Sequence, residues 1–320
     1  MERPRVNFEV WPEAIELGHL FAARGYELAL VGGPVRDLLL HRRSHDLDFC
    51  TSAHPDEFEP ILRHWGRDGF WDMGRKFGTL GAMRRREDGT EVKVEITTYR
   101  SDTYDPESRK PEVSYGDSLE GDLSRRDFTV NAMALRVPQL EFVDPFGGTS
   151  DLAKGVLRTP VDPYQSFDDD PLRMMRCVRF ATQLNFYIDE ETFEALERNR
   201  ERIKIISRER IADELNKIML SPIPSKGFID LDRSGLLELI FPELVALQGV
   251  ETRNGRAHKD NFYHTLEVLD NISRVTDNLW LRWSALLHDI AKPVTKRWEP
   301  KAGWTFHNHN FIGEKMIPNI

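Results

Sequence analysis

The stretch LVGGPVRDLLLHRRSHDLDFC, residues 30–50, decides the fold of the first part of the chain. The apolar run Glu27 to Val31 predicts a buried strand, and it leads through Gly32-Gly33 into a helix that begins near Val35. Glycines at a strand-to-helix turn allow backbone N–H groups to approach phosphate oxygens, and a helix N-terminus favours an anion. The turn therefore predicts a cradle for a triphosphate.

Asp46 and Asp48 follow on a second expected strand, 46–50. Residues two apart on a strand point to the same face, and two carboxylates there repel each other unless a cation lies between them. Carboxylate oxygens suit Mg²⁺. A phosphate cradle beside a metal pair suits nucleotidyl transfer by two metal ions. Either motif alone is more often structural, as a simple turn or a solvated strand end, and the combination is more specific.

Glu95 is a candidate third carboxylate. Val92, Val94 and Ile96 alternate with polar residues, which predicts a strand from Val92 to Tyr99 with Glu95 on the face opposite the apolar side chains. Glu95 then either faces the metal pair or is an exposed strand glutamate, and the pattern favours neither interpretation.

The segment 125–131, RRDFTVN, joins a polar stretch to an apolar run. Arg126 can contact phosphate, while Asp127 and Asn131 can hydrogen-bond ribose hydroxyls. Taken alone, the segment predicts only a helix start with Asp127 as its cap.

A second candidate for nucleotide recognition is the segment 168–173, DDDPLR, which is also ordinary helix-start chemistry. Asp170 and Arg173 lie three residues apart and share one helix face. A carboxylate that accepts from the exocyclic amine of C or A, beside a guanidinium that donates to the ring, imitates the edge of a template base. Arg176 and Arg179 continue this ridge towards phosphates.

Histidines gather in the last part of the chain, at His258, His264, His288 and His309. The adjacent His288-Asp289 pair is typical of metal-dependent phosphohydrolases, so a metal site and a set of helix-surface histidines are about equally expected.

Composition describes a globular protein with a formal net charge of −9, which argues against broad binding to nucleic acid. Local basic clusters at 84–86 and 198–210 could still contact RNA, or could be a hairpin tip and a solvated helix face. Two cysteines, Cys50 and Cys177, fit a reducing cytoplasm, and no apolar run is long enough to cross a membrane.

The periodicity changes along the chain. Helices are expected at 10–25, 34–41 and 55–65, and strands at 27–33, 46–50, 77–83 and 92–99, with a long loop over 101–121. From residue 151 onward the pattern is helical, and it predicts another all-α region from about Gly255. The expected fold is α+β, with an α/β head followed by helical modules.

Six motifs in order carry a family resemblance. They are GGPVRD with DLDF, RRDFTVNAMA, DPFGGTSDL (144–152), DDPLRMMRCVRF, RERIADELNKIML, and the set HKDNFYHTLEVLD, LLHDIAKP and HNHNFIGEKM. Together they resemble the bacterial class II tRNA nucleotidyltransferase/poly(A) polymerase family with an HD domain. The resemblance implies a polymerase-β-like head over 1–152, a helical neck over 153–222, a helical body over 223–254 and an HD domain over 255–320.

The resemblance also implies roles for single residues. Asp46 and Asp48 would bind two Mg²⁺ that activate the tRNA 3′-hydroxyl and stabilise the α-phosphate. The triphosphate would be held by four residues, Gly32, Gly33, Arg36 and Arg126. Asp127 and Asn131 would read the ribose, and Asp170 and Arg173 would select CTP and then ATP. The segment 99–116 is similar to the flexible loop needed to switch from C to A, which argues against an enzyme that adds C alone.

In the last domain, a second divalent metal is expected at His264, His288 and Asp289. Asn310 follows His309 where the family has an acidic residue, and the later Asp that completes an HD site is not in the sequence. We therefore expect the HD domain to be incomplete at Ile320 and the C-terminal tRNA-gripping part to be missing, which argues against phosphohydrolase activity.

The sequence leaves other functions open. A poly(A) polymerase of the same family would have an almost identical head and would reject CTP. An HD phosphohydrolase with a nucleotide-binding head, or a non-catalytic RNA-binding module, would not need Asp46. The favoured reading is addition of C, C and A to the tRNA 3′ end.

Overall fold

The computed structural model describes residues 10–103, 112–116 and 118–320, and the chain forms two compact units, residues 1–169 and 170–320. Within the described residues, no helix combines the length and apolar character needed to span a membrane. The loop expected over 101–121 lies partly outside the described residues. Where it is described, the prediction of a loop is wrong, because β6 (Arg100–Thr103) and β7 (Glu112–Tyr115) pair as antiparallel strands and a helix, α4 (Leu119–Ser124), follows.

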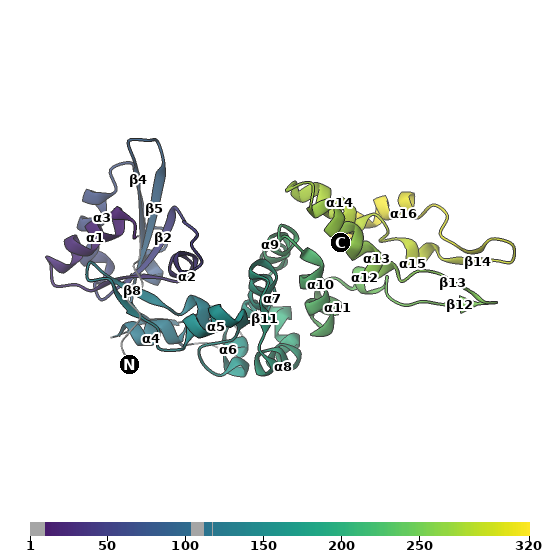
Figure 1. Cartoon of the computed structure of the whole chain (residues 1–320), viewed down its shortest axis with the longest axis horizontal. Coiled ribbons are helices and arrows are strands. Elements are labelled where there is room, and N and C mark those ends of the chain that lie inside the picture. Colours follow the sequence, from purple (N-terminus) through teal and green to yellow (C-terminus); the bar gives the residue numbers. More distant parts are fainter. Residues whose placement is uncertain (1–9, 104–111, 117) are drawn as a thin grey trace. The chain divides into compact units, whose positions relative to one another are not determined.

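The first unit is mixed α/β (Figure 1). Its elements are α1 (Pro12–Ala22), β1 (Leu28–Val31), α2 (Gly33–Leu39), β2 (Asp46–Thr51), α3 (Pro55–Trp65), β3 (Gly69–Trp71), β4 (Thr79–Arg85), β5 (Glu91–Thr98), β6 (Arg100–Thr103), β7 (Glu112–Tyr115), α4 (Leu119–Ser124), β8 (Ala134–Val137), β9 (Glu141–Val143), α5 (Gly148–Lys154), β10 (Val156–Leu157) and α6 (Pro163–Asp169). Short 3₁₀ turns occur at Arg75–Phe77 and Thr129–Asn131. The expected strands and helices up to residue 99 are confirmed, whereas β3 was not foreseen.

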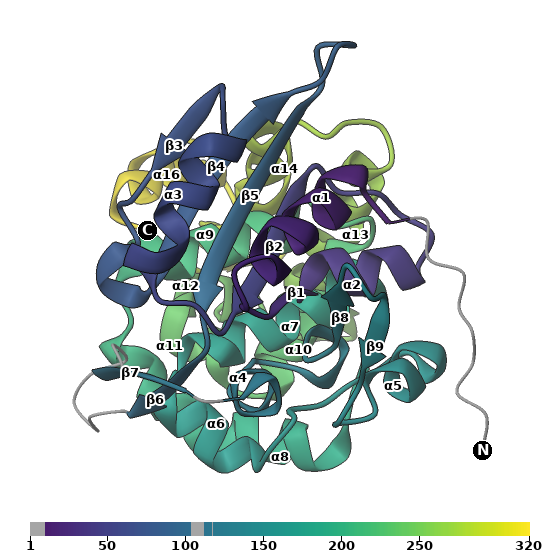
Figure 2. The same cartoon turned by 90° about the vertical axis from the view of Figure 1, so that its left-hand side faces the viewer.

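One seven-stranded sheet forms the centre of this unit, in the order β3-β4-β5-β2-β1-β8-β9. β2 and β5 run parallel, and the other neighbouring pairs whose register is described are antiparallel. Helices α1 and α3 pack on one face, against β1, β8 and β4 (Figure 2). Helix α4 covers part of the opposite face, where its Leu119 and Leu123 pack with Ala29, Val31 and Cys50. The strand alternation decides which of the two faces each side chain takes.

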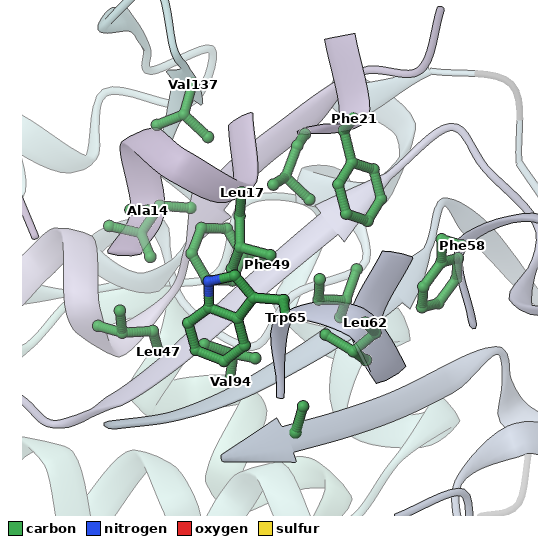
Figure 3. Close-up of a cluster of buried hydrophobic side chains, with 14 of the residues drawn as sticks. Ala14, Leu17, Phe21, Leu47, Phe49, Phe58, Leu62, Trp65, Val94 and Val137 are labelled. Carbon is green, nitrogen blue, oxygen red and sulfur yellow. The ribbon is translucent and has the colours of Figure 1, made fainter. Parts of the chain in front are cut away.

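The covered face holds the main hydrophobic core (Figure 3). The indole of Trp65, fully buried at the end of α3, lies among Leu17, Phe49, Leu62 and Val94. Burying aromatic and aliphatic side chains of this size contributes roughly 1.5–3 kcal/mol each. Leu47 and Val94 point into this core, so Asp46, Asp48 and Glu95, which alternate with them, point to the other face.

The second unit is mainly helical. Its elements are α7 (Leu172–Leu184), β11 (Tyr187–Ile188), α8 (Glu190–Asn199), α9 (Arg208–Met219), α10 (Pro224–Arg233), α11 (Leu236–Ile240), α12 (Pro242–Val245), β12 (Thr252–Arg253), β13 (Arg256–Ala257), α13 (Asn261–Ser273), α14 (Leu279–Leu287), α15 (Lys292–Thr295), β14 (Arg297–Glu299), β15 (Gly303–Thr305) and α16 (His309–Met316), with 3₁₀ turns at Arg200–Ile205 and Ile317–Asn319.

Two sequence-based expectations fail in this unit. The region after Gly255 is not all-α, because β12 pairs with β13 and β14 pairs with β15 as two short hairpins. The helix start expected within 168–173 is a break between two helices, α6 and α7, which are separated at Asp170-Pro171, so Asp170 lies outside α7 and does not share a helix face with Arg173 as expected. Pro171 has no N–H to donate to a preceding carbonyl, which explains the break.

Candidate active site

Three carboxylates share the face of the head sheet that lies opposite α1 and α3. The parallel register of β2 and β5 places Asp48 directly beside Glu95, and Asp46 directly beside Lys93. Asp46, Asp48 and Glu95 are all exposed to solvent, while Leu47 and Val94 between them are buried. Glu95 therefore lies on the same face as the aspartate pair, as a third carboxylate would require, and it is also an exposed strand glutamate.

The negative charges of the three carboxylates on this face repel one another. The loss of hydration around Asp48 raises the pKa of its carboxyl, the nearby Arg126 guanidinium opposes the rise, and the charges of Glu95 and Asp46 add to it. Like charges held on one face favour a bound cation, which relieves their repulsion. The donor set, three carboxylate groups, fits a hard divalent cation such as Mg²⁺.

Arg126 is held in place by Asp122, a residue that the sequence analysis did not identify. The carboxylate of Asp122 in α4 is 1% exposed, and its Oδ2 accepts a hydrogen bond from Arg126 Nη2 at 3.0 Å. Its Oδ1 accepts from Arg125 Nη2 at 2.8 Å and from Arg125 Nε at 3.1 Å. Burial alone would raise the pKa of Asp122, but the two guanidinium groups hold it below its usual value. An acidic residue three and four positions before two arginines on a helix was the available signal.

The glycine turn lies next to the same arginine. Gly32 has φ of 71°, a left-handed conformation that favours glycine, and it caps α2. A Cβ built at Gly32 would lie 3.2 Å from Arg126 Nη1, so the turn and the guanidinium are close neighbours. The expected cradle and the expected phosphate-binding arginine are therefore brought together, and Gly33 follows as the first residue of α2.

A chain of hydrogen bonds joins the other predicted nucleotide residues. Arg36 Nη1 donates to Asn131 Oδ1 at 2.8 Å, and Asn131 Nδ2 donates to Asp127 Oδ1 at 3.0 Å. Arg36 also pairs with Asp37, at 2.8 Å. Asp127 does not cap an α-helix, because the backbone after it forms the 3₁₀ turn Thr129–Asn131. These hydrogen bonds bring the Arg36 guanidinium, the Asn131 amide and the Asp127 carboxylate together.

The motif at 144–152 holds this turn in place. Thr129 Oγ1 donates to the buried Asp151 Oδ2 at 2.7 Å, and Asp151 Oδ1 pairs with Arg158 Nη2 at 3.1 Å. The Thr129 N–H in turn donates to the Arg158 carbonyl at 2.9 Å. Gly148 packs so closely that a Cβ there would lie 2.2 Å from the Thr129 carbonyl oxygen. The motif therefore supports the segment that carries Asn131.

The two residues predicted to select the nucleobase, Asp170 and Arg173, belong to the second unit, as do Arg176 and Arg179, which were expected to extend the ridge towards phosphates. Asp170 Oδ1 accepts from the Leu172 N–H at 3.2 Å, at the start of α7, and Arg173 is 8% exposed. Arg179 forms a buried ion pair with Glu214 of α9, 3.0 Å from Nε to Oε2. Arg176 and Arg179 both lie over the Phe180 ring. Helix α7, which carries Arg173 and begins two residues after Asp170, is thus tied to α9 through Glu214.

The histidine cluster of the second unit contains a set of potential metal ligands. Within the described parts of the chain, one group of three such side chains has ligand atoms within 4.8 Å of one another, and it consists of His264, His288 and Asp289. The carboxylate oxygens of Asp46, Asp48 and Glu95 in the head do not all lie within 4.8 Å of one another.

Charge pairing sets the pKa values in this cluster. Asp289 Oδ2 forms an ion pair with Lys292 Nζ at 2.6 Å and lies 3.2 Å from His288 Nε2, while Asp289 Oδ1 lies 3.6 Å from His309 Nε2. The hydrogen bond to Asp289 raises the pKa of His288, against the effect of burial. Burial would raise the pKa of Asp289, but His288 and Lys292 lower it to about 2. Two imidazoles and a carboxylate fit a divalent transition metal.

The basic cluster at 84–86 is paired with glutamates. Arg84 pairs with Glu16, and Arg86 pairs with the mostly buried Glu13, at 2.6 Å in both cases. Arg85 pairs with Glu91 at 2.7 Å. These pairs favour a structural role for the cluster over a contact with RNA.

Comparison with known proteins matches three successive regions to family models. Residues 28–158 match the model described as "Poly A polymerase head domain", residues 185–247 match "Probable RNA and SrmB-binding site of polymerase A", and residues 261–320 match "HD domain". The fold class expected from the sequence, a polymerase-β-like head with an HD domain, is therefore confirmed.

Similar curated proteins, and some of the similar solved structures, are named CCA-adding enzymes. A CCA-adding enzyme of Anoxybacillus flavithermus is 37% identical over 292 residues, 91% of this chain and 67% of the relative. The crystal structure of the Bacillus stearothermophilus CCA-adding enzyme in complex with CTP is 34% identical, with a TM-score of 0.62 over 71% of this chain and 53% of that one.

A tRNA nucleotidyltransferase complexed with a primer tRNA and an incoming ATP analogue is 26% identical, with a TM-score of 0.64 over 85% of this chain and 75% of that one. The chain spans from about half to two thirds of the length of the curated relatives, from 51% to 67%. Three family models match in succession along the chain, and a curated CCA-adding enzyme is 37% identical over 67% of its own length. The chain therefore belongs to the CCA-adding enzyme family.

Proposed function

We propose that this chain is a nucleotidyltransferase that adds C, C and A to the 3′ end of tRNA from CTP and ATP, without a nucleic-acid template. The observation that carries the proposal is the shared face of Asp46, Asp48 and Glu95 beside the Arg126 guanidinium. Nucleotidyl transfer needs carboxylates for divalent cations next to a cation that holds the triphosphate. The names of the solved relatives, one with CTP and one with tRNA and an ATP analogue, support it.

In this proposal the head residues bind and orient the nucleotide. Arg126, anchored by Asp122, contacts the triphosphate together with Arg36 and the backbone N–H groups of Gly32 and Gly33. The carboxylates, with Glu95 as the third, would hold two Mg²⁺, which supply charge neutralisation at the α-phosphate and a lowered pKa of the tRNA 3′-hydroxyl. The 3′-oxygen bonds to the α-phosphorus, pyrophosphate leaves, and the hydroxyl proton passes to water.

The remaining residues supply selectivity. Asp127 and Asn131 hydrogen-bond the ribose, a role favoured by the hydrogen bond between them and by the hydrogen bond from Arg36 to Asn131. Asp170 and Arg173 present an acceptor and a donor to the Watson–Crick edge of C and then of A. Arg176 and Arg179 extend this basic surface, and Glu214 keeps Arg179 in place.

The second unit adds a metal site to the proposal. His264, His288 and Asp289 would hold a divalent metal, because their ligand atoms already converge. We place the protein in the cytoplasm, where tRNA is processed, which is consistent with the free, buried thiols of Cys50 and Cys177.

Nucleotide incorporation tests the function. A tRNA that ends at the discriminator base is incubated with the protein and with CTP alone, ATP alone, or both. We expect two C residues from CTP, a terminal A only when both nucleotides are present, and no incorporation by the Asp46→Ala variant. Incorporation that survives Asp46→Ala would contradict the assignment of the site.

A poly(A) polymerase is the second candidate, because the family model that matches residues 28–158 describes a poly(A) polymerase head. The same assay separates the two functions. Long tracts of A with no use of CTP would favour the polymerase, and a stop after C, C and A would exclude it.

A further inference from the structure

Four directly paired residues form a row across the head sheet that ends at Trp71. Trp71 on the edge strand β3 pairs with Gly81, Gly81 pairs with Glu95, and Glu95 pairs with Asp48. Directly paired residues on neighbouring strands point to the same face. The indole of Trp71 therefore lies on the carboxylate face, two strands away from Glu95.

Gly81 allows the indole to reach across that gap. A Cβ at Gly81 would lie 2.0 Å from Cε2 and 2.2 Å from Nε1 of Trp71, so the ring passes over the place that a side chain would occupy. Strands two apart in a sheet are separated by about 10 Å, which an indole laid flat over a glycine can bridge. The position of the Trp71 ring therefore depends on the absence of a side chain at Gly81.

The reach of the indole ends at the third carboxylate. Trp71 Nε1 donates a hydrogen bond to Glu95 Oε1 at 3.3 Å. An indole N–H can only donate, so the Glu95 oxygen is the acceptor in this contact. The contact leaves Oε2 of Glu95 available to a cation beside Asp48.

We propose that Trp71 is a positioning residue for Glu95, and that it thereby tunes the affinity of the head for divalent cations. The inference rests on the proposed function, in which Glu95 is the third carboxylate of the metal site. A hydrogen-bond donor behind a ligating carboxylate fixes the direction of its free oxygen, and loss of such a partner costs about 10- to 100-fold in metal affinity or activity.

Direct metal binding gives the first test. Mn²⁺, which takes the same oxygen ligands as Mg²⁺, is titrated into the full chain and followed by its electron paramagnetic resonance signal. The Asp48→Asn variant defines which bound ions belong to the head. We expect Trp71→Phe, which keeps an aromatic ring but removes the N–H, to weaken that head-specific binding by about 10-fold.

Gly81→Ala gives an independent perturbation. The alanine methyl group displaces the Trp71 indole. The variant keeps the tryptophan and its Nε1–H donor but moves that donor away from Glu95. We expect the same loss of head-specific Mn²⁺ binding as in Trp71→Phe. Trp280→Phe, at a tryptophan that is 73% exposed in the second unit, is the matched control and should bind Mn²⁺ like the parent.

Transfer kinetics distinguish positioning from general damage. We expect the Mg²⁺ concentration for half-maximal incorporation to rise about 10-fold in Trp71→Phe, with the maximal rate recovered at saturating Mg²⁺. Unchanged Mn²⁺ affinity in a folded Trp71→Phe, or in Glu95→Gln, would overturn the inference. Loss of Mn²⁺ binding in Asp48→Asn together with unchanged Trp71→Phe would refute the role of Trp71 alone, whereas full binding in Asp48→Asn would refute the proposed metal site itself.

Discussion

Replacing Asp122 by Asn should destabilise the head, because this carboxylate is the buried partner of two arginines. Removing one partner from a buried ion pair costs about 3–5 kcal/mol. Here the Arg125 and Arg126 side chains keep 17% and 21% of their surface in solvent, so water recovers part of the loss. We therefore expect a decrease of about 2–3 kcal/mol in the free energy of unfolding, and a weaker affinity for CTP because Arg126 loses its anchor.

Urea unfolding followed by tryptophan fluorescence measures this loss. Glu120→Gln, the same kind of change on the same helix at an exposed side chain, is the control and should cost at most about 0.5 kcal/mol. The effect should also depend on pH. Because the pKa of folded Asp122 lies below its usual 3.8, its ionised form stabilises the protein above about pH 4, and this contribution disappears as the pH falls through the folded pKa.

The difference in the free energy of unfolding between wild type and Asp122→Asn should thus be largest at pH 7 and should decrease below pH 4. The reasoning would be refuted by a cost as small as that of Glu120→Gln at pH 7. A difference that stays constant down to pH 3 would show that the carboxylate charge is not the cause.

Three further outcomes follow from the geometry. Gly148→Ala places a methyl group against the Thr129 carbonyl and should cost about 1–3 kcal/mol and raise the KM for CTP, and an unchanged melting temperature would speak against the close packing. Glu214→Gln should cost about 3 kcal/mol in the free energy of unfolding, because it leaves Arg179 buried without its counter-charge, and a melting curve equal to the parent's would contradict this. His288→Ala should remove one bound Zn²⁺ per chain by metal analysis; in the parent, Zn²⁺ binding should weaken as pH falls through the raised pKa of His288, above 6.5, and pH-independent binding would argue against ligation by this residue.

The local elements of the head were predictable because their signals are local. The period of two in β2 and β5 and the Gly32 turn each lie within a few residues, and α3 was bounded correctly at Pro55 and Trp65. The position of Glu95 beside Asp48 could not be predicted, because alternation shows which face a side chain takes but not which strand lies next to it.

Other contacts were missed because they join distant segments. Arg86 finds Glu13 of α1, 73 positions earlier, and no pattern within either segment announces the pair. The hairpins near Arg256 and Trp304 are only two or three residues per strand, too short for alternation to stand out. The expectation of an all-α region failed for that reason.

The direct pairing of β2 with β5 has a practical consequence for anyone who alters this protein. The spacing between Asp48 and Glu95 is set by the backbone ladder, so an inserted residue inside β5 would send Val94 outward and Glu95 into the core. The tip that joins β4 to β5, around Gly89, lies outside the ladder, and a Cβ there would meet nothing within 4 Å. A fluorescent tag or a peptide epitope belongs at that tip, where added chain length leaves the alignment of the carboxylates untouched.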